Sequence, residues 1–349
     1  MGLLRFYLAL CVLLGHIGVH CFISPIYAVQ GFYIISGFYI SLILNERYKT
    51  PTNNSTFYKK RFLRLMPTYW VIALLSLLVA LCYYHHNESN ILFFDFNHFP
   101  SQVSIFTLLY IYITNIIAWG QDLAFFLCIS PENGNMFFSS LSFADDYPLA
   151  RYLIIPVSWS ISTEISFYLI APFILRKKHT LVFCIFMLSV ASNILTNLYG
   201  FNNSSWRFRF FPSTLTFFLT GYYAYLIYDR LQKQIIDTNY KYIVLFLDIL
   251  LITSFLHMNN FFAIHECILL FIEFISIPYL YYAFKNNTTD RSIGELSYPL
   301  YLIHPLFIGI DELCGIHSKP FIIMGSIFGA YCCLRYWIIP IEKLRSKIH

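Results

Sequence analysis

The first residues that could do chemistry are Arg5 and His16, which stand at the two ends of an apolar stretch of the chain. Eleven helical steps of about 100° and about 1.5 Å each turn a helix roughly three times, so both side chains are expected on one face. If Arg5 marks the membrane edge, His16 lies near mid-bilayer, where polar side chains are rare and usually functional. A neutral, buried imidazole can act as a general base. The pair therefore predicts a catalytic His16, with a hydrogen-bonded core histidine as the alternative.

A second polar stripe consists of Ser160, Glu164 and Tyr168, which recur at every fourth position of an apolar segment that begins at Trp159. These positions share one helix face. Because an unpaired carboxylate at membrane depth is costly, Glu164 should have a partner. It could orient His16, pair with Arg5 or another cation, or lock two helices together, and we rank these structural or orienting roles above direct proton transfer.

Basic residues precede the next candidate site. Arg61 and Arg64 lead to Pro67, where we expect a helix to begin. Guanidinium groups suit multiply anionic phosphates, because they make bidentate, charge-assisted hydrogen bonds. Ordinary anchoring of a cytoplasmic loop is the alternative, and Arg64 is the residue that we separate from that background.

Three residues near the C-terminal end of the chain, Ser297, Tyr301 and His304, again share a helix face. The proline that follows His304 frees backbone carbonyls within its helix, so His304 could bond to that backbone or contact a substrate. Ser36 and Gly37 form a further small-residue site, since glycine permits close backbone approach. It would serve either helix packing or a narrow donor channel.

The amino-acid composition indicates the class of protein in which these residues are placed. The chain is 58% hydrophobic and only 12% charged, and its mean hydropathy is +0.61. A soluble domain carries about 25% charged residues. The composition therefore predicts an integral membrane protein, and we expect a single domain over residues 1–349. The nine cysteines are scattered without a metal-ligand spacing, so no metal site is expected.

Eleven apolar runs approach the roughly 20 residues that cross a bilayer. They cover residues 6–24, 27–45, 67–84, 103–120, 152–175, 180–200, 211–228, 242–258, 262–284, 295–312 and 320–340. Basic clusters at residues 47–64, 176–178, 230–241, 285–291 and 343–347 should all be cytoplasmic. That parity requires one run between residues 64 and 176 not to cross, and 103–120 is the best candidate. We expect an all-α polytopic protein with about ten transmembrane helices, one re-entrant or interfacial segment, and both termini cytoplasmic.

Taken in order, these motifs resemble the acyltransferase 3 family of integral membrane acyltransferases. The matching features are an arginine and a histidine in the first span and an S-G-F in the second. They continue with R-x-x-R-x-x-P before the third, W-S-x-x-x-E-x-x-F-Y-x-x-x-P, and a late S-Y-x-x-Y-L-x-H. Each is present, and together they extend over essentially the whole chain. The esterase-like C-terminal domain of some members is not expected here.

The resemblance implies O-acyl transfer, usually of acetyl, from cytoplasmic acyl-CoA to a carbohydrate hydroxyl at a bacterial inner membrane. The acceptor would be a sugar of lipopolysaccharide, capsule, exopolysaccharide or peptidoglycan. Acetyl-CoA or another acyl-CoA would be a substrate, with no tightly bound cofactor and no nucleic-acid partner. His16, Arg5 and Glu164 would be catalytic, and Arg61, Arg64, Ser36 and Gly37 would bind the donor. The remaining motif residues would bind substrate or support the fold: Trp159, Ser160, Tyr168, Ser297, Tyr301 and His304.

The alternative function is a secondary transporter or exporter of a small molecule or lipid-linked saccharide, which would also place polar residues at mid-membrane. A transporter typically shows an internal repeat and paired broken helices, and neither is evident in this sequence.

Overall fold

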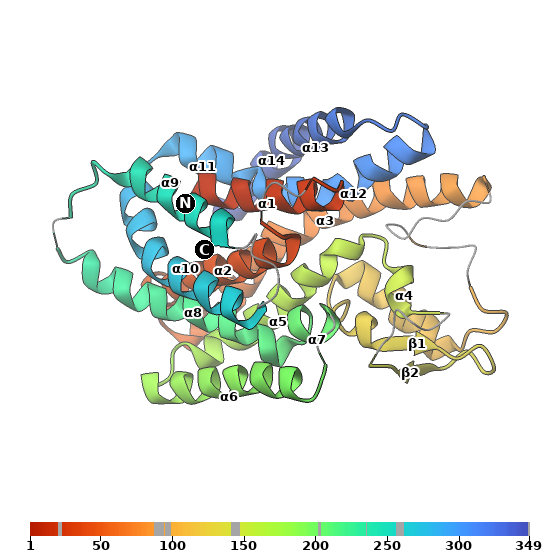
Figure 1. Ribbon diagram of the computed structural model, residues 1–349, viewed down its shortest axis with the longest axis horizontal. Helices are drawn as coiled ribbons and strands as arrows, with labels where there is room; N and C mark the ends of the chain where they lie inside the picture. The colour runs from red at the N-terminus through yellow and green to blue at the C-terminus, as the bar shows by residue number, and fades with distance from the viewer. Residues whose placement is uncertain are drawn as a thin grey trace. The chain divides into compact units, whose positions relative to one another are not determined.

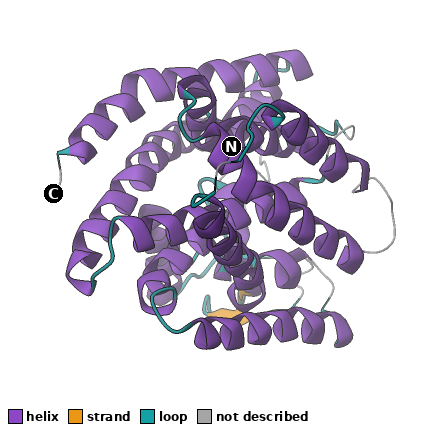
Figure 2. Ribbon diagram, turned by 90° about the vertical axis from the view of Figure 1, so that its left-hand side faces the viewer, coloured by secondary structure: helices purple, strands orange, loops and turns teal. Residues whose placement is uncertain are grey.

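The protein is built almost entirely from helices, which Figures 1 and 2 trace through the computed structural model. The structure describes residues 1–19, 23–86, 94, 99–140, 147–201, 204–234, 236–255 and 262–347. The helices are α1 (Gly2–His16), α2 (Pro25–Glu46), α3 (Asn54–His85), α4 (Ile105–Ile117), α5 (Trp159–Ile174), α6 (His179–Leu198), α7 (Ser204–Phe208), α8 (Phe211–Leu231), α9 (Lys241–Phe255), α10 (Phe262–Phe284), α11 (Thr288–Glu295), α12 (Ser297–Leu313), α13 (Lys319–Cys333) and α14 (Ile339–Ser346).

Each of the eleven apolar runs corresponds to a helix, which confirms the all-α prediction. Seven helices within the described ranges are long and apolar enough to cross a membrane. Two shorter apolar helices, α1 and α4, add to these. The chain is therefore a multi-pass helical membrane protein, while the number of ten spans and the cytoplasmic termini stay predictions.

The first helix is shorter than expected. The apolar run continues to residue 24, but α1 ends at His16 and Gly18 adopts a positive φ of 69°. The turn is tight because a Cβ on Gly15 would come within 2.3 Å of the Pro25 ring, which begins α2. Fifteen residues span only about 22 Å, less than the roughly 30 Å hydrocarbon core. The prediction of a span over 6–24 is wrong in its C-terminal boundary.

The third helix is longer than expected. A start at Pro67 was predicted, but α3 begins at Asn54 and continues through the proline. Phe57, Arg61, Leu65 and Tyr69 are all buried at four-residue intervals. Burial of this stripe stabilises one continuous helix across the basic and the apolar segments. This stabilisation exceeds the cost of the one backbone hydrogen bond that Pro67 cannot donate.

The segment predicted to be re-entrant forms α4, a helix of only 13 residues. Ser104 caps its N-terminus, and Ala118 ends it in the left-handed region with φ 54°. Asn115 is buried and donates to the Tyr152 carbonyl at 2.8 Å, as expected for a polar group facing protein. At about 20 Å the helix is too short to cross alone, and whether it re-enters stays a prediction.

One short antiparallel hairpin accompanies these helices and was not predicted. It pairs β1 (Leu127–Ile129) with β2 (Met136–Phe138), with Cys128 opposite Phe137. It follows α4 after a turn of 3-10 helix, η3 (Leu123–Phe126). Figure 2 shows these strands as a small element beside the helices. Strands this short carry too little alternation for the sequence to indicate them.

The chain divides into two compact units, each assembled from separate stretches. The first unit contains residues 1–57, 167–190 and 214–301, and the second contains residues 58–166, 191–213 and 302–349. Within the first unit, α1 packs on α2 and α11, and α10 packs on α9 and α2. The prediction of a single domain over residues 1–349 stays a prediction.

A glycine crossing holds α2 against α8 in the first unit. A Cβ on Gly37 would lie 1.9 Å from the Phe218 carbonyl oxygen, and one on Gly221 would lie 2.0 Å from the Ile34 carbonyl oxygen. Two backbones approach this closely only where both helices carry glycine. The S-G-F motif therefore has a packing role, whatever else its residues do.

Candidate functional site

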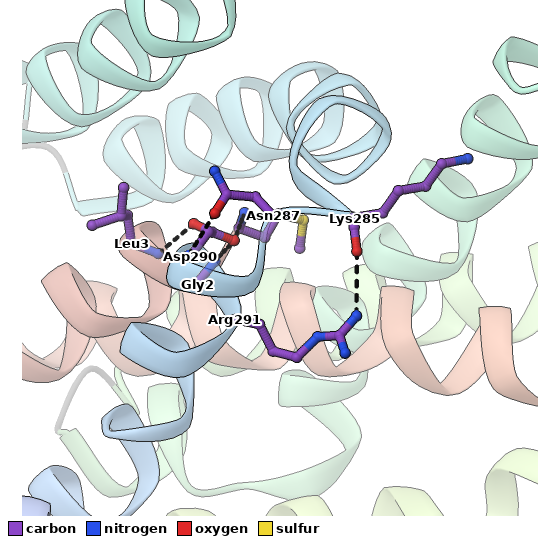
Figure 3. A network of polar contacts seen from close by, with 7 residues as sticks. Gly2, Leu3, Lys285, Asn287, Asp290 and Arg291 are labelled. Carbon is purple, nitrogen blue, oxygen red and sulfur yellow. Dashed lines mark hydrogen bonds and ion pairs between the residues drawn. The ribbon is translucent and has the colours of Figure 1, made fainter.

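The N-terminus of α1 is fixed by a carboxylate from α11. Asp290 Oδ2 accepts from the backbone N–H of Gly2 at 2.7 Å, and Oδ1 accepts from that of Leu3 at 2.9 Å (Figure 3). Oδ2 also accepts from the amino group of Met1 at 2.9 Å. These contacts satisfy the unpaired N–H groups of the first turn and place negative charge at the positive end of the helix dipole.

The capping carboxylate is itself held in place. Asn287 caps α11 by accepting from the Asp290 backbone N–H at 3.0 Å (Figure 3). A Cβ on Gly2 would meet the Asp290 carbonyl oxygen at 1.7 Å, and a Cβ on Gly294 would meet Gly2 Cα at 2.6 Å. The first motif, on α1, is thus bound to α11, the helix that directly precedes the late motif on α12.

Arg5 and His16 lie near the two ends of α1. Arg5 is half-buried, and His16 is the last helical residue, with an exposed side chain. The expectation that the protein buries His16 is therefore wrong, because α1 is buried as far as Leu14 and His16 lies on its last, more exposed turn. An exposed imidazole at a helix end can reach a substrate directly, and its catalytic role stays a prediction.

The small-residue site on α2 contains one packed and one more open residue. Gly37 is buried against Phe218 of α8, whereas Ser36 is half-buried. The Ser41 hydroxyl donates to the Gly37 carbonyl at 2.7 Å and completes the local packing. Of these two predicted donor-binding residues on α2, Ser36 is thus the more exposed.

The two predicted phosphate-binding arginines lie on α3 in the second unit. The Arg61 side chain is buried, and Arg64 is half-buried one turn further along the helix. Lys59, on the same helix, is exposed. Both arginines are therefore more buried than Lys59, but Lys60 is half-buried like Arg64, so burial separates only Arg61 from both lysines.

The predicted polar stripe of Ser160, Glu164 and Tyr168 lies on α5, and its three side chains differ in exposure. Ser160 is 7% exposed and donates to the Val157 carbonyl at 3.0 Å. Glu164 is half-buried. Tyr168 is buried and packs edge-to-face on Phe57, with ring centroids 6.5 Å apart. Glu164 is the member of this stripe with the most accessible side chain.

A second polar stripe, which begins one residue before α5 and continues along it, was not predicted. Ser158, Ser162 and Ser166 also recur at four-residue spacing, and all three hydroxyls bind the segment that follows α4. Ser158 donates to the side-chain oxygen of Gln121, and Ser166 accepts from the indole N–H of Trp119 at 2.9 Å. The four-residue spacing of these serines is visible in the sequence, but the prediction for this helix was based on Glu164, which lies on another face.

The middle serine of this stripe holds a buried carboxyl group. Ser162 donates to Asp122 Oδ1 at 2.6 Å and accepts from the backbone N–H groups of Gly120 and Gln121. Asp122 is 4% exposed, and burial raises the pKa of its carboxyl, while the Ser162 hydrogen bond acts in the opposite direction. The network fixes the end of α4 to α5, the helix that carries Glu164 on a different face.

Trp159 packs against Arg209 and Phe125 in the second unit. The Arg209 guanidinium carbon lies 4.7 Å from the Trp159 ring centroid and 4.0 Å from that of Phe125. Trp159 is 8% exposed, and its ring meets Phe125 edge-to-face. This cation–π stack gives Trp159 a supporting role beside its motif.

The late motif lies on α12 and begins at its first residue, Ser297. The Ser297 hydroxyl donates to the Gly294 carbonyl at 2.7 Å, and Tyr301 packs on Phe32 of α2 with ring centroids 6.1 Å apart. His304 is completely buried. Ser297 therefore supports the turn between α11 and α12, and a substrate role for His304 stays a prediction.

The predicted residues divide between the two units. The first unit holds Arg5, His16, Ser36, Gly37, Tyr168, Ser297 and Tyr301, and the second holds Arg61, Arg64, Trp159, Ser160, Glu164 and His304. Packing within the first unit connects α2 to α1, to α8 and, through Phe32 and Tyr301, to α12. One site that includes both sets stays a prediction.

Comparison with known proteins gives one finding. A family model described as an acyltransferase domain, that of acyltransferase 3, matches residues 1–339. The searches of curated proteins and of solved structures give no match. The match extends from the first motif on α1 to the start of α14 and includes every residue predicted for the site.

Proposed function

Since the chain belongs to the acyltransferase 3 family and is therefore a membrane acyltransferase, we propose that it moves an acyl group, in particular acetyl, from cytoplasmic acyl-CoA to a carbohydrate hydroxyl of the bacterial envelope. The observation that carries the proposal is the family match over residues 1–339. The transporter alternative does not account for that match. Acceptor sugars of lipopolysaccharide, capsule, exopolysaccharide or peptidoglycan all present suitable hydroxyl groups.

His16 is the general base in this proposal. Its neutral imidazole takes the proton of the sugar hydroxyl while the hydroxyl oxygen attacks the thioester carbonyl carbon. The carbon–sulfur bond breaks, an ester forms on the sugar, and the leaving thiolate takes the proton back from the imidazolium. Exposure of His16 at the end of α1 supports this role, because the base must reach the acceptor.

Charged side chains complete the proposed site. Arg61 and Arg64 would hold the phosphates of the donor, since both carry guanidinium groups with part or most of the side chain shielded from solvent. Glu164 would orient or balance His16, in keeping with its half-buried position on α5. Arg5 would guide the thioester end of the donor or secure the N-terminal end of α1.

The function is tested by measuring alkali-labile acyl esters on envelope carbohydrate from cells with and without the gene. Deletion should remove the ester from one carbohydrate fraction, and expression of the wild-type chain should restore it. The purified protein in lipid nanodiscs should then release one CoA for each ester that forms on that fraction. Equal ester content in every fraction of both strains would contradict the proposal.

Replacement of Arg64 tests donor recognition. Arg64→Ala should raise the KM for acyl-CoA by about tenfold or more, because a charge-assisted hydrogen bond contributes about 1.5–3 kcal/mol. The kcat at saturating donor should change little. Initial rates at varied donor concentration, with Lys59→Ala as the matched control on the same helix, give both constants. An unchanged KM for Arg64→Ala, or an equal rise for Lys59→Ala, would return Arg64 to a membrane-anchoring role.

A further inference from the structure

Two acidic side chains that the proposed reaction does not use lie in the interior of the first unit. Asp248 on α9 is 3% exposed, and Glu273 on α10 is 0% exposed. Ser276 follows Glu273 by three positions, shares its helix face and is 8% exposed. Because α9 and α10 pack on each other, these side chains form one cluster between the two helices.

The polar atoms of this cluster have no protein partner. Both carboxylate oxygens of Asp248, both of Glu273 and the Ser276 hydroxyl make no hydrogen bond with any residue in the described ranges. Asp248 interacts electrostatically with both Ser276 and Glu273, so the three side chains are neighbours. Three buried oxygen-bearing groups therefore lie on two packed helices without a hydrogen-bonded or ion-paired cation among the described residues.

Two ionised carboxylates cannot remain in this state. Removing a charge from water without a partner is strongly unfavourable, and a second like charge nearby adds repulsion. A buried pair of this kind persists when a cation neutralises it, as carboxylates inside membranes typically bind protons or ions.

We propose that Asp248, Glu273 and Ser276 form a binding site for one compact monovalent cation, either a proton shared by the two carboxyls or Na⁺. Carboxylate and hydroxyl oxygens are hard ligands that suit both. The cluster offers five side-chain oxygens, two from each carboxyl group and one from the hydroxyl group. A divalent ion with six to eight oxygen ligands would exceed what this cluster offers.

The described residues of the neighbouring helices α1 and α2 make no hydrogen bond or ion pair with the cluster. Glu273 interacts with Asp248 of α9 and lies near Gly31 of α2, which in turn meets Leu8 of α1. The titratable side chains of α1 are Arg5, Tyr7, Cys11 and His16, and those of α2 are Tyr27, Tyr33, Tyr39 and Glu46. None of these forms a hydrogen bond or ion pair with Asp248 or Glu273 in the part of the chain that the structure describes.

The lysines at the ends of α9 and α10 are also engaged elsewhere. Lys241 lies over the rings of Tyr242 and Phe284, and Lys285 lies over those of Tyr228 and Tyr282. The Tyr7 hydroxyl contacts the Thr253 hydroxyl, which links α1 to α9 at 2.5 Å. A bound cation would therefore neutralise the carboxyl charge of Asp248 and Glu273 and stabilise the packing of α9 and α10 on α1 and α2.

The test is the thermal unfolding midpoint of the purified protein in lipid nanodiscs. It is measured across a pH series in NaCl and in N-methylglucamine chloride at equal ionic strength. The variants are Asp248→Asn, Glu273→Gln and the double variant, and the control is Asp229→Asn, which removes an exposed carboxylate from α8. The amides mimic neutralised carboxyl groups, so the variants should fold if the site is normally neutral.

For a proton site, the wild-type midpoint should fall as pH rises from about 6 to 9, with the folding equilibrium changing up to about tenfold per pH unit. For a sodium site, NaCl should raise the midpoint at the upper end of that series and N-methylglucamine should not. The double variant should lose either dependence, and Asp229→Asn should keep it. A wild-type midpoint that responds to neither cation, a response retained in the double variant, or failure of both single variants to fold would each overturn the proposal.

Discussion

His16→Ala should lower acyl transfer by about 10²–10⁴-fold, because this is the contribution that a positioned general base makes to a proton-transfer step. The protein should still fold, since the His16 side chain is exposed at the end of α1 and its removal leaves no buried cavity. The measurement is the initial rate of ester formation on the acceptor with saturating acyl-CoA. Yield in the membrane fraction and the thermal unfolding midpoint report on the fold.

The matched control for this variant is His85→Ala. His85 is also an exposed histidine and the last residue of an apolar helix, α3, but no motif includes it. Its replacement should leave the rate within about twofold of wild type, as expected for a surface change away from a site. If His16→Ala retains substantial activity, or if both variants lose activity equally, His16 is not the base.

Gly37→Ala should prevent accumulation of folded protein. The new Cβ would lie 1.9 Å from the Phe218 carbonyl oxygen and 2.7 Å from its carbon, so α2 and α8 would have to separate. Overpacking of a close contact costs about 1–3 kcal/mol where side chains can adjust, and a contact with backbone allows less adjustment. The yield of monodisperse protein in detergent and its thermal unfolding midpoint measure the effect.

Gly31→Ala is the control on the same helix. Its Cβ would meet the flexible end of Leu8, at 3.1 Å, rather than backbone, so the loss of stability should be clearly smaller. A Gly37→Ala protein with normal yield and midpoint but a raised KM for acyl-CoA would show that Gly37 lines the donor channel. In that case the packing role assigned from the crossing with α8 would be wrong.

The sequence by itself determined the fold class and the order of the helices. Low charge and long apolar runs leave a chain no stable arrangement except helices that satisfy their own backbone hydrogen bonds in lipid. For this reason each apolar run reappears as a helix, even the short α4 between its polar flanks. The five ordered motifs also identified the family, because side-chain chemistry at fixed spacing is a property of the sequence alone.

Helix boundaries were decided by tertiary contacts. Hydropathy continues past His16, but the packing of Gly15 on Pro25 and the turn at Gly18 end α1 there. Pro67 signals a helix start, yet the buried stripe from Phe57 to Tyr69 makes the preceding basic segment part of α3. Both errors arose because local signals describe propensity, whereas burial of a particular face depends on which helices pack against it.

The residues that support the site could also not be predicted from the sequence. Asp290 reads as an ordinary surface acid, and only the fold brings its carboxylate to the first turn of α1. The pair of Asp248 and Glu273, which has no hydrogen-bond partner among the described residues, likewise depends on how α9 lies against α10. Periodicity shows which residues of one helix share a face, but it contains no information on the helix that this face will meet.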